Sequence, residues 1–234
     1  MYGTILASIH DRWFDSLARA AASDVLGRLQ GRGGARVVDG GCGSGVFLSA
    51  VAASAAELTG IDVSPEMVAL ARGRVPRARF IVGDVLDVEL PGADVIALVG
   101  EVLSYAAAAP GFSSDRLRAF LRRASEALTP GGVMLFDVLG DEHDYSGTFF
   151  REEPEYTVVS SVRQERDLVR RRVVSFLETG PGFEKSVEVH ELRTFSAEAL
   201  ESLLEDSGLS ARRLPGYGGE PGLPGRLTWE CRAA

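Results

Sequence analysis

A short glycine-rich segment, Val37-Val38-Asp39-Gly40-Gly41-Cys42-Gly43-Ser44-Gly45, constrains this chain more than any other feature. Two β-branched residues are typical of a buried strand, and an acid follows them. Glycines at alternate positions allow the backbone to turn sharply and to approach a ligand closely. The N–H groups of such a loop, leading into a helix, suit a charged small molecule. The segment therefore predicts a strand, a loop and a helix that bind such a molecule.

Strands and helices alternate through the first 140 residues. An apolar residue at nearly every fourth position predicts an amphipathic helix over residues 8–29. Ser64-Pro65-Glu66 has the composition of a helix start. Strands are expected at residues 35–39, 58–61, 79–82, 93–99 and 133–138, with helices after the first two and a further helix over 114–128. Interposed helices favour parallel pairing in a doubly wound sheet, whose ligands bind at the carboxyl ends of the strands.

The pattern changes after Val138. Three β-rich runs at 156–164, 168–177 and 183–195 have no helix between them and are expected to pair antiparallel. Ser196 begins a last helix, and 209–214 and 227–231 form a final antiparallel pair. We predict one α/β domain over 1–234, a doubly wound, mostly parallel seven-stranded sheet with an inserted antiparallel β layer. Its parts are an N-terminal helical segment (1–31), a cofactor-binding core (32–140), an inserted β cap (141–195), and a closing helix and β-hairpin (196–234).

Composition excludes several classes of protein. A net charge of −8 disfavours a nucleic-acid binder, which needs a basic surface. The chain has two cysteines and three scattered histidines, so no disulfide framework and no metal site is expected. We find neither a membrane-spanning run nor a secretory signal, and we expect a cytoplasmic protein with no membrane partner.

The residues around the glycine loop indicate which small molecule binds. A dinucleotide fingerprint needs Gly or Ala where Val46 stands, and Asp39 would repel a pyrophosphate. An amino group suits Asp39 better. Asp62 follows the second strand, where a carboxylate accepts from both ribose hydroxyls, and Asp84 follows the third, where it accepts from an adenine amine. A ligand with an amine, a ribose and an adenine but no phosphate fits S-adenosylmethionine.

The chain resembles the class I S-adenosylmethionine-dependent methyltransferases over roughly residues 8–234. Four segments match that family in order and spacing, namely VVDGGCGSG (37–45), LTGIDVSPEMVALAR (58–72), FIVGDVLD (80–87) and LTPGGVMLFDV (128–138). The β insertion is similar to that of small-molecule enzymes such as the glycine N-methyltransferases and the deoxyaminosugar N,N-dimethyltransferases. In those groups it covers the acceptor site or builds a dimer, so the resemblance implies a small-molecule acceptor and a homodimer through the inserted layer.

The resemblance also implies roles for individual residues of the cofactor site. Asp39, Gly41 and Gly43 are expected to line the methionine moiety, with Cys42 in the same loop. Asp62 is expected to hold the ribose. The remaining expected cofactor contacts are with the adenine, from Val63, Met67, Asp84 and Val85, and with the methyl-donor side, from Gly100 and Glu101.

Methyl transfer is an in-line displacement, and a base assists when the acceptor arrives protonated. Candidates for acid–base catalysis are Glu101 and Tyr105, by their position after the fourth strand, and His190 on the third inserted run. His10, Trp13, Tyr105, His190 and Arg193 are the expected acceptor contacts. Each also has a structural alternative: Trp13 fits an apolar helical stripe, and His190 fits an ordinary strand position. Arg163 and Arg170–Arg172 are interpreted as a solvated strand face paired with acids.

Three other functions remain open at this stage. One is an S-adenosylmethionine-binding regulatory or assembly protein without catalysis. The second, a nicotinamide-dependent reductase, is disfavoured by Val46 and Asp39. The third is a methyltransferase acting on a macromolecule, against which the chain lacks a separate domain to grip one. A small-molecule N- or O-methyltransferase is the favoured prediction.

Overall fold

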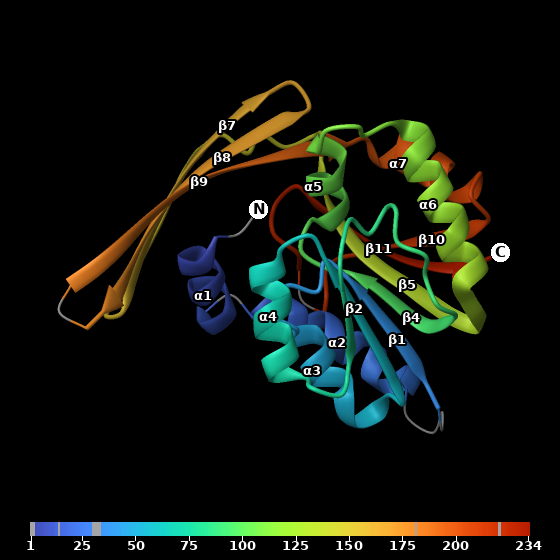
Figure 1. Cartoon of the computed structure of the whole chain (residues 1–234). Coiled ribbons are helices and arrows are strands. Elements are labelled where there is room, and N and C mark those ends of the chain that lie inside the picture. Colours follow the sequence, from blue (N-terminus) through green and yellow to red (C-terminus); the bar gives the residue numbers. More distant parts are fainter. Residues whose placement is uncertain (1–2, 14, 30–33, 181, 220) are drawn as a thin grey trace.

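The central sheet of the computed structural model has the predicted doubly wound plan. The model describes residues 3–13, 15–29, 34–180, 182–219 and 221–234. The strand order is β3-β2-β1-β4-β5-β11-β10 (Figure 1). The first five strands pair parallel, whereas β11 pairs antiparallel with both β5 and β10. These strands are β1 (Arg36–Gly40), β2 (Glu57–Asp62), β3 (Arg79–Val82), β4 (Ala93–Leu98), β5 (Leu128–Gly140), β10 (Leu209–Leu214) and β11 (Arg226–Ala233).

Helices cover both faces of this sheet because its buried strands alternate between two apolar cores. Val38, Ile96 and Phe136 face one core, which α5 (Val102–Ala108), α6 (Ser114–Ala127) and α7 (Ala197–Glu205) complete. Val37 and Val95, the residues just before Val38 and Ile96, face the other core. There they meet α2 (Ser16–Leu29) and α3 (Val46–Val51), after which a 3-10 turn (Ala52–Ser54) leads into β2. This period of two confirms that both faces are buried.

The N-terminal segment forms two helices, so the prediction of one helix over 8–29 is wrong. α1 (Thr4–Trp13) precedes α2 and does not share its surface. Leu6 and Ile9 of α1 pack on the inserted sheet, whereas the apolar residues of α2 pack on the central one. The four-residue spacing continues through both helices, but it serves two different surfaces.

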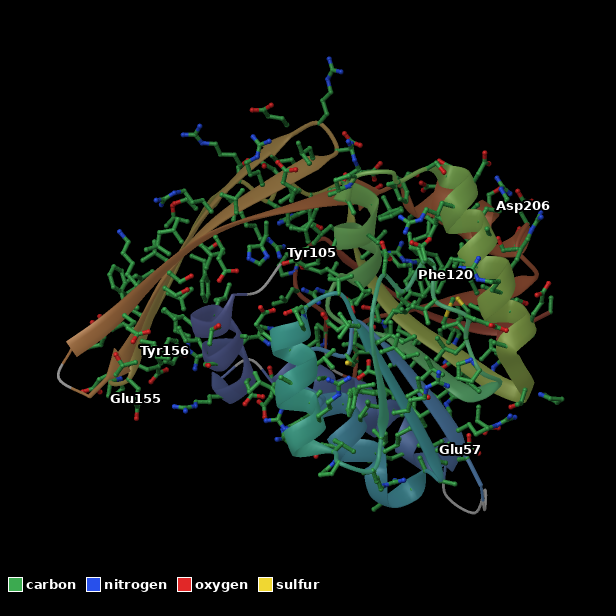
Figure 2. The ribbon with its side chains drawn as sticks, viewed as in Figure 1. Glu57, Tyr105, Phe120, Glu155, Tyr156 and Asp206 are labelled. Carbon is green, nitrogen blue, oxygen red and sulfur yellow. The ribbon has the colours of Figure 1, made fainter. Side chains whose placement is uncertain are left out.

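The inserted sheet has four strands where three were predicted: β6 (Gly147–Glu153), β7 (Tyr156–Glu165), β8 (Leu168–Thr179) and β9 (Gly182–Phe195). All pair antiparallel, and β9 also pairs parallel with the end of β5 at Leu139–Thr194 and Gly140–Phe195. β6 is an edge strand and mostly exposed, so its sequence shows little apolar alternation. The sheet projects beyond the core, and Tyr156 lies on its face toward α1 (Figures 1 and 2).

Several local predictions were confirmed, and others were corrected. Ser64 caps α4 (Pro65–Arg74), accepting from the Met67 N–H at 3.2 Å. Leu70 of that helix is 36% exposed, although Met67 and Ala71 are buried. Ser113 caps α6, which lies where a helix over 114–128 was predicted, and the short helix α5 was not predicted. No helix among the described residues is long and apolar enough to cross a membrane.

Candidate functional site

A cavity of about 410 Å³ opens at the carboxyl ends of the parallel strands. Its floor comes from the loops that follow β1, β2, β3 and β4, and its other walls come from α1, α5 and β9. The predicted residues that line it are His10, Gly41, Gly43, Asp62, Val63, Met67, Asp84, Val85, Gly100, Tyr105 and His190. The structure therefore brings most of the predicted cofactor and acceptor residues to one place, as expected for a doubly wound sheet.

The glycine loop has a backbone that other residues would strain. Gly41, Gly43 and Gly45 have φ values of +71°, +50° and +80°. The N–H of Gly41 donates to the Ile61 carbonyl at 2.7 Å, which fixes the loop against β2. A Cβ on Gly41 would lie 2.4 Å from Cγ2 of Val102 on α5, whereas Gly43 has open space at that position. Glycine is therefore required at 41 by packing as well as by conformation.

Asp39 is a buried acid with an unused hydrogen-bonding atom. Its side chain is 2% exposed, and its Oδ2 has no hydrogen-bond partner among the described residues. Burial, reinforced by the charge of Asp62, raises the pKa of Asp39 well above its usual range. A buried carboxylate without a partner is costly, and a bound ammonium group would compensate it. Asp39 is not among the residues that line the cavity, so this atom suits an amino group that reaches the base of the glycine loop directly or through a water.

Asp62 is held in a fixed orientation at the end of β2. Its Oδ2 accepts from the Gly43 N–H and its Oδ1 from the Ser64 N–H, both at 2.8 Å. Burial raises the pKa of Asp62, against the effect of these two hydrogen bonds. A carboxylate has about four acceptor sites, so both oxygens keep capacity for hydroxyl donors from the cavity. This geometry fits a ribose.

The other predicted cofactor residues have mixed surroundings. Val63, Met67 and Val85 also line the cavity. Asp84 also lines it, but its Oδ1 accepts from the Leu86 N–H and its Oδ2 pairs with Arg116 at 2.9 Å. Cys42 is buried against Gly60 and is not among the lining residues.

Glu101 is engaged by two guanidinium groups and does not line the cavity. Its carboxylate pairs with Arg171 of β8 at 2.6 Å and with Arg226 of β11 at 2.7 Å. Burial acts to raise the pKa of Glu101, but these two cations outweigh it and hold that pKa below its usual range. Arg171 thus belongs to a buried network, so its interpretation as part of a solvated face is wrong. Arg170, paired with exposed Glu191, fits that interpretation.

Asp137 joins this network from β5. Its carboxylate accepts from the N–H groups of Gly100 and Glu101, from the Tyr217 hydroxyl at 3.0 Å, and from Arg226 at 2.7 Å. Glu101 has φ +65° and is the residue before α5, and these bonds fix the backbone of the turn after β4. Burial raises the pKa of Asp137. The network positions α5, from which Tyr105 reaches the cavity.

Tyr105 and His190 meet where α5 and β9 line the cavity. The Tyr105 hydroxyl lies 3.3 Å from His190 Nδ1, and His190 Nε2 lies 3.1 Å from Oε2 of Glu188. The rings of Tyr105 and His190 are 5.8 Å apart in an edge-to-face arrangement. Burial lowers the pKa of His190, partly opposed by Glu188. Two predicted acceptor-side residues are therefore in direct contact.

α1 closes the cavity from the N-terminal side. Asp11 pairs with Arg74 of α4 at 2.5 Å, and the same guanidinium donates to the Ser44 carbonyl of the glycine loop at 2.8 Å. His10, which precedes Asp11 in α1, lines the cavity, and burial lowers the pKa of His10. The side chain of Trp13 lies outside the described residues. Arg193 is directed elsewhere, because it pairs with Asp167 at the β7–β8 turn.

Sequence reasoning missed five residues of this site: Asp137, Arg171, Glu188, Tyr217 and Arg226. Asp137 had a signal, since it follows an apolar run in β5 much as Asp39 does in β1. Glu188 is two residues from His190 and on the same strand face, a spacing that could have suggested a contact. The other three are remote in sequence from the groups they bind, and we find no local signal for them.

S-adenosylmethionine, which the sequence predicts, fits this site. The unpartnered Oδ2 of Asp39 matches its ammonium group, and oriented Asp62 matches its ribose. The glycine loop leaves open space at Gly43 for close approach.

Comparisons with known proteins agree with this fit. A family model described as a methyltransferase domain matches residues 37–132. The dTDP-3-amino-3,6-dideoxy-alpha-D-glucopyranose N,N-dimethyltransferase of Streptomyces fradiae is 29% identical over 218 residues, covering 88% of this chain and 84% of that protein.

Solved structures share the fold over nearly the whole chain. One is an S-adenosylmethionine-dependent methyltransferase from Clostridium acetobutylicum, with a TM-score of 0.84 and 19% identity over 97% of each chain. Another is CalS10, an amino pentose methyltransferase from Micromonospora echinaspora with S-adenosylmethionine bound. It has a TM-score of 0.77 and 23% identity, covering 100% of this chain and 98% of that one.

Proposed function

We propose that this chain, a member of the class I S-adenosylmethionine-dependent methyltransferases, methylates a nitrogen or oxygen of a small molecule bound between the central and inserted sheets. The observation that supports this proposal most directly is the composition of one cavity. Asp62 and the glycine loop line it together with Tyr105 and His190. A donor and an acceptor held in one enclosed space react in effect within a single molecule.

The cofactor end is proposed to act by binding and orientation. When bound, S-adenosylmethionine supplies a methyl carbon activated by a sulfonium. Asp39 compensates the ammonium group through a charge-assisted hydrogen bond or a water, and Asp62 accepts from the ribose hydroxyls. Val63, Met67 and Val85 enclose the adenine, and Asp84 lies at its edge while remaining paired with Arg116. Gly100 leaves room for in-line approach of the acceptor.

The acceptor end is proposed to be formed by Tyr105, His190 and His10, with Glu101 as a positioning residue. Glu101 is held by Arg171 and Arg226, so its carboxylate acts by fixing the turn before α5. The relatives include two amino-sugar N,N-dimethyltransferases, from Saccharopolyspora spinosa and Streptomyces fradiae. Their names favour nitrogen over oxygen as the atom methylated.

Two experiments test this function. Calorimetry should detect binding of S-adenosylhomocysteine, and Asp62→Ala should weaken it by about 1.5–3 kcal/mol for each hydrogen bond lost. Glu57→Ala, at the opposite end of β2, is the matched control, since Glu57 is exposed and outside the lining. Transfer of a labelled methyl group is then measured against a panel of small amines, amino sugars and their hydroxyl analogues.

Each possible result has a defined meaning. Release of S-adenosylhomocysteine with a panel member supports the proposal. Tight cofactor binding with no transfer to the panel or to a cell extract favours a regulatory or assembly protein. Label that appears only in the macromolecular fraction of the extract favours a macromolecular acceptor. Absence of binding contradicts the cofactor assignment.

We also propose a homodimer through the inserted sheet. Phe150, Val159, Val174 and Val187 are register partners across its four strands. They lie on the face opposite to the one that packs on α1, and Phe150 and Val187 are 59% and 46% exposed. Light scattering should give the mass of a dimer, and Phe150→Asp should give that of a monomer. A monomeric wild-type protein would contradict this proposal.

A further inference from the structure

Three side chains form a chain of contacts that leads away from the acceptor end of the cavity. Tyr105 lies on α5, and His190 and Glu188 lie two residues apart on β9. We propose that they form a proton relay that deprotonates an acceptor entering the cavity as an ammonium group. Tyr105 and His190 carry the proton, and Glu188 positions His190. This inference rests on the proposed function and deepens it by naming the class of acceptor.

The contacts fix the tautomer of His190. A carboxylate can only accept, so His190 Nε2, at 3.1 Å from Glu188, must carry hydrogen. In the neutral ring Nδ1 is then an acceptor, and it faces the Tyr105 hydroxyl at 3.3 Å. Tyr105 therefore donates toward His190, and it also lines the cavity. Ser186 Oγ donates to the other oxygen of Glu188 at 3.2 Å and holds it in place.

The surroundings of His190 favour its neutral form, which can accept a proton. Facing it are Glu188 on its own strand, Tyr105 of α5, Arg171 of β8 and His10 of α1. Burial and Arg171 lower the pKa of His190, and Glu188 acts in the opposite direction. The imidazole is thus neutral at pH 7. Once it is protonated, Glu188 stabilises the imidazolium that forms.

The proton affinity of imidazole favours an ammonium over a hydroxyl as the acceptor. An alkylammonium has a pKa of about 10.4 and imidazole one of about 6.5. Water, as a guide to a hydroxyl, has a pKa of about 15.7. A histidine relay is therefore far better matched to an ammonium than to a hydroxyl.

The proposed step moves one proton to His190 and one methyl group to the acceptor nitrogen. An N–H bond of the acceptor ammonium breaks and its proton passes to the Tyr105 oxygen, while the proton of Tyr105 passes to His190 Nδ1. The neutral amine then bonds to the methyl carbon as the carbon–sulfur bond breaks, and the sulfur keeps the electron pair. The products are a methylated ammonium, S-adenosylhomocysteine and an imidazolium, which returns its proton to solvent.

The tautomer and the coupling are tested by NMR without any acceptor. Only three histidines are present, so ¹⁵N-histidine labelling with His190→Asn as the assignment variant isolates the His190 signals. The expected result is hydrogen on Nε2 of the neutral ring, and a pKa that Glu188→Gln lowers further by about one unit. Glu184→Gln, an exposed acid on the same strand, is the control and should leave that pKa unchanged. Hydrogen on Nδ1, or a pKa that Glu188→Gln does not move, would overturn the relay.

Steady-state kinetics with the amine that is methylated fastest test whether the relay is used during methyl transfer. Because only neutral imidazole accepts, kcat should rise with pH through the pKa of His190. Glu188→Gln should shift this rise to lower pH and reduce the plateau about tenfold, and Tyr105→Phe should reduce it about a hundredfold. Glu184→Gln should reproduce the wild-type profile. An unshifted profile in Glu188→Gln would overturn the positioning role.

Failure of the relay and failure of the proposed function give different results. Unmeasurable S-adenosylhomocysteine binding contradicts the function, whereas the NMR titration still decides the relay. Transfer to hydroxyl members in preference to amines keeps the function and overturns the ammonium acceptor.

Discussion

Replacing Arg226 with methionine removes a cation that lies between two buried carboxylates. Its guanidinium pairs with Asp137 and Glu101, each at 2.7 Å. The side chains of Arg226, Asp137 and Glu101 are 9%, 0% and 7% exposed, so water cannot replace the lost contacts. Methionine retains most of the apolar stem, so the substitution chiefly removes charge.

The loss in the free energy of unfolding depends on which hydrogen-bond and ion-pair partners Asp137 and Glu101 keep. Breaking a buried ion pair from one side costs about 3–5 kcal/mol. Glu101 keeps Arg171, and Asp137 keeps two backbone N–H donors and the Tyr217 hydroxyl. We therefore expect the lower end, a loss of about 3 kcal/mol in the free energy of unfolding at pH 7.5. For a chain of 234 residues this corresponds to a fall in Tm of about 6–12 °C.

The loss should depend on pH in a defined direction. Burial already raises the pKa of Asp137 above its usual range, and removing Arg226 raises it further. Between the unfolded and folded pKa values the folded state binds more protons, so stability falls as pH rises through that window. Arg226→Met should therefore be more destabilising at pH 8 than at pH 5.

Urea unfolding followed by circular dichroism at both pH values measures the effect. Arg118→Met is the matched control, because Arg118 makes a partly exposed pair with Asp206 at 2.9 Å and should lose at most about 1 kcal/mol. If Arg226→Met unfolds within 1 kcal/mol of Arg118→Met at pH 8, the network does not have the energetic role assigned to it here.

Two further predictions concern the glycine loop and its acid. Asp39→Asn should weaken S-adenosylhomocysteine binding by about 1.5–3 kcal/mol. Because the pKa of Asp39 is raised, wild-type affinity should also increase with pH as that acid ionises, and calorimetry should show no such increase in the variant. Gly41→Ala should destabilise the fold more than Gly43→Ala, since both have positive φ but only a Cβ at 41 meets Val102, at 2.4 Å. Val102→Ala should recover part of the difference in urea unfolding, and equal losses in the two alanine variants would contradict this packing argument.

The parts of the fold that the sequence predicted correctly depend on local chemistry. The glycines after β1 need positive φ, and Ser64 with Pro65 begins a helix, whatever the rest of the chain does. Strand alternation likewise follows from which residues are apolar. These signals were sufficient for the doubly wound sheet and for placing most of the predicted cofactor residues around one cavity.

The inserted region and the acceptor end depended on packing between distant segments. Glu101 was predicted as a catalytic residue because it follows β4, but its partners are 70 and 125 residues away. Tyr105 and His190 were each singled out, yet their contact joins residues 85 apart. The periodicity of a sequence indicates which face of an element is buried, but it does not indicate which charge lies opposite. That pairing is decided only when the inserted sheet docks on the core, because the charge that a buried acid or base meets determines what it can do.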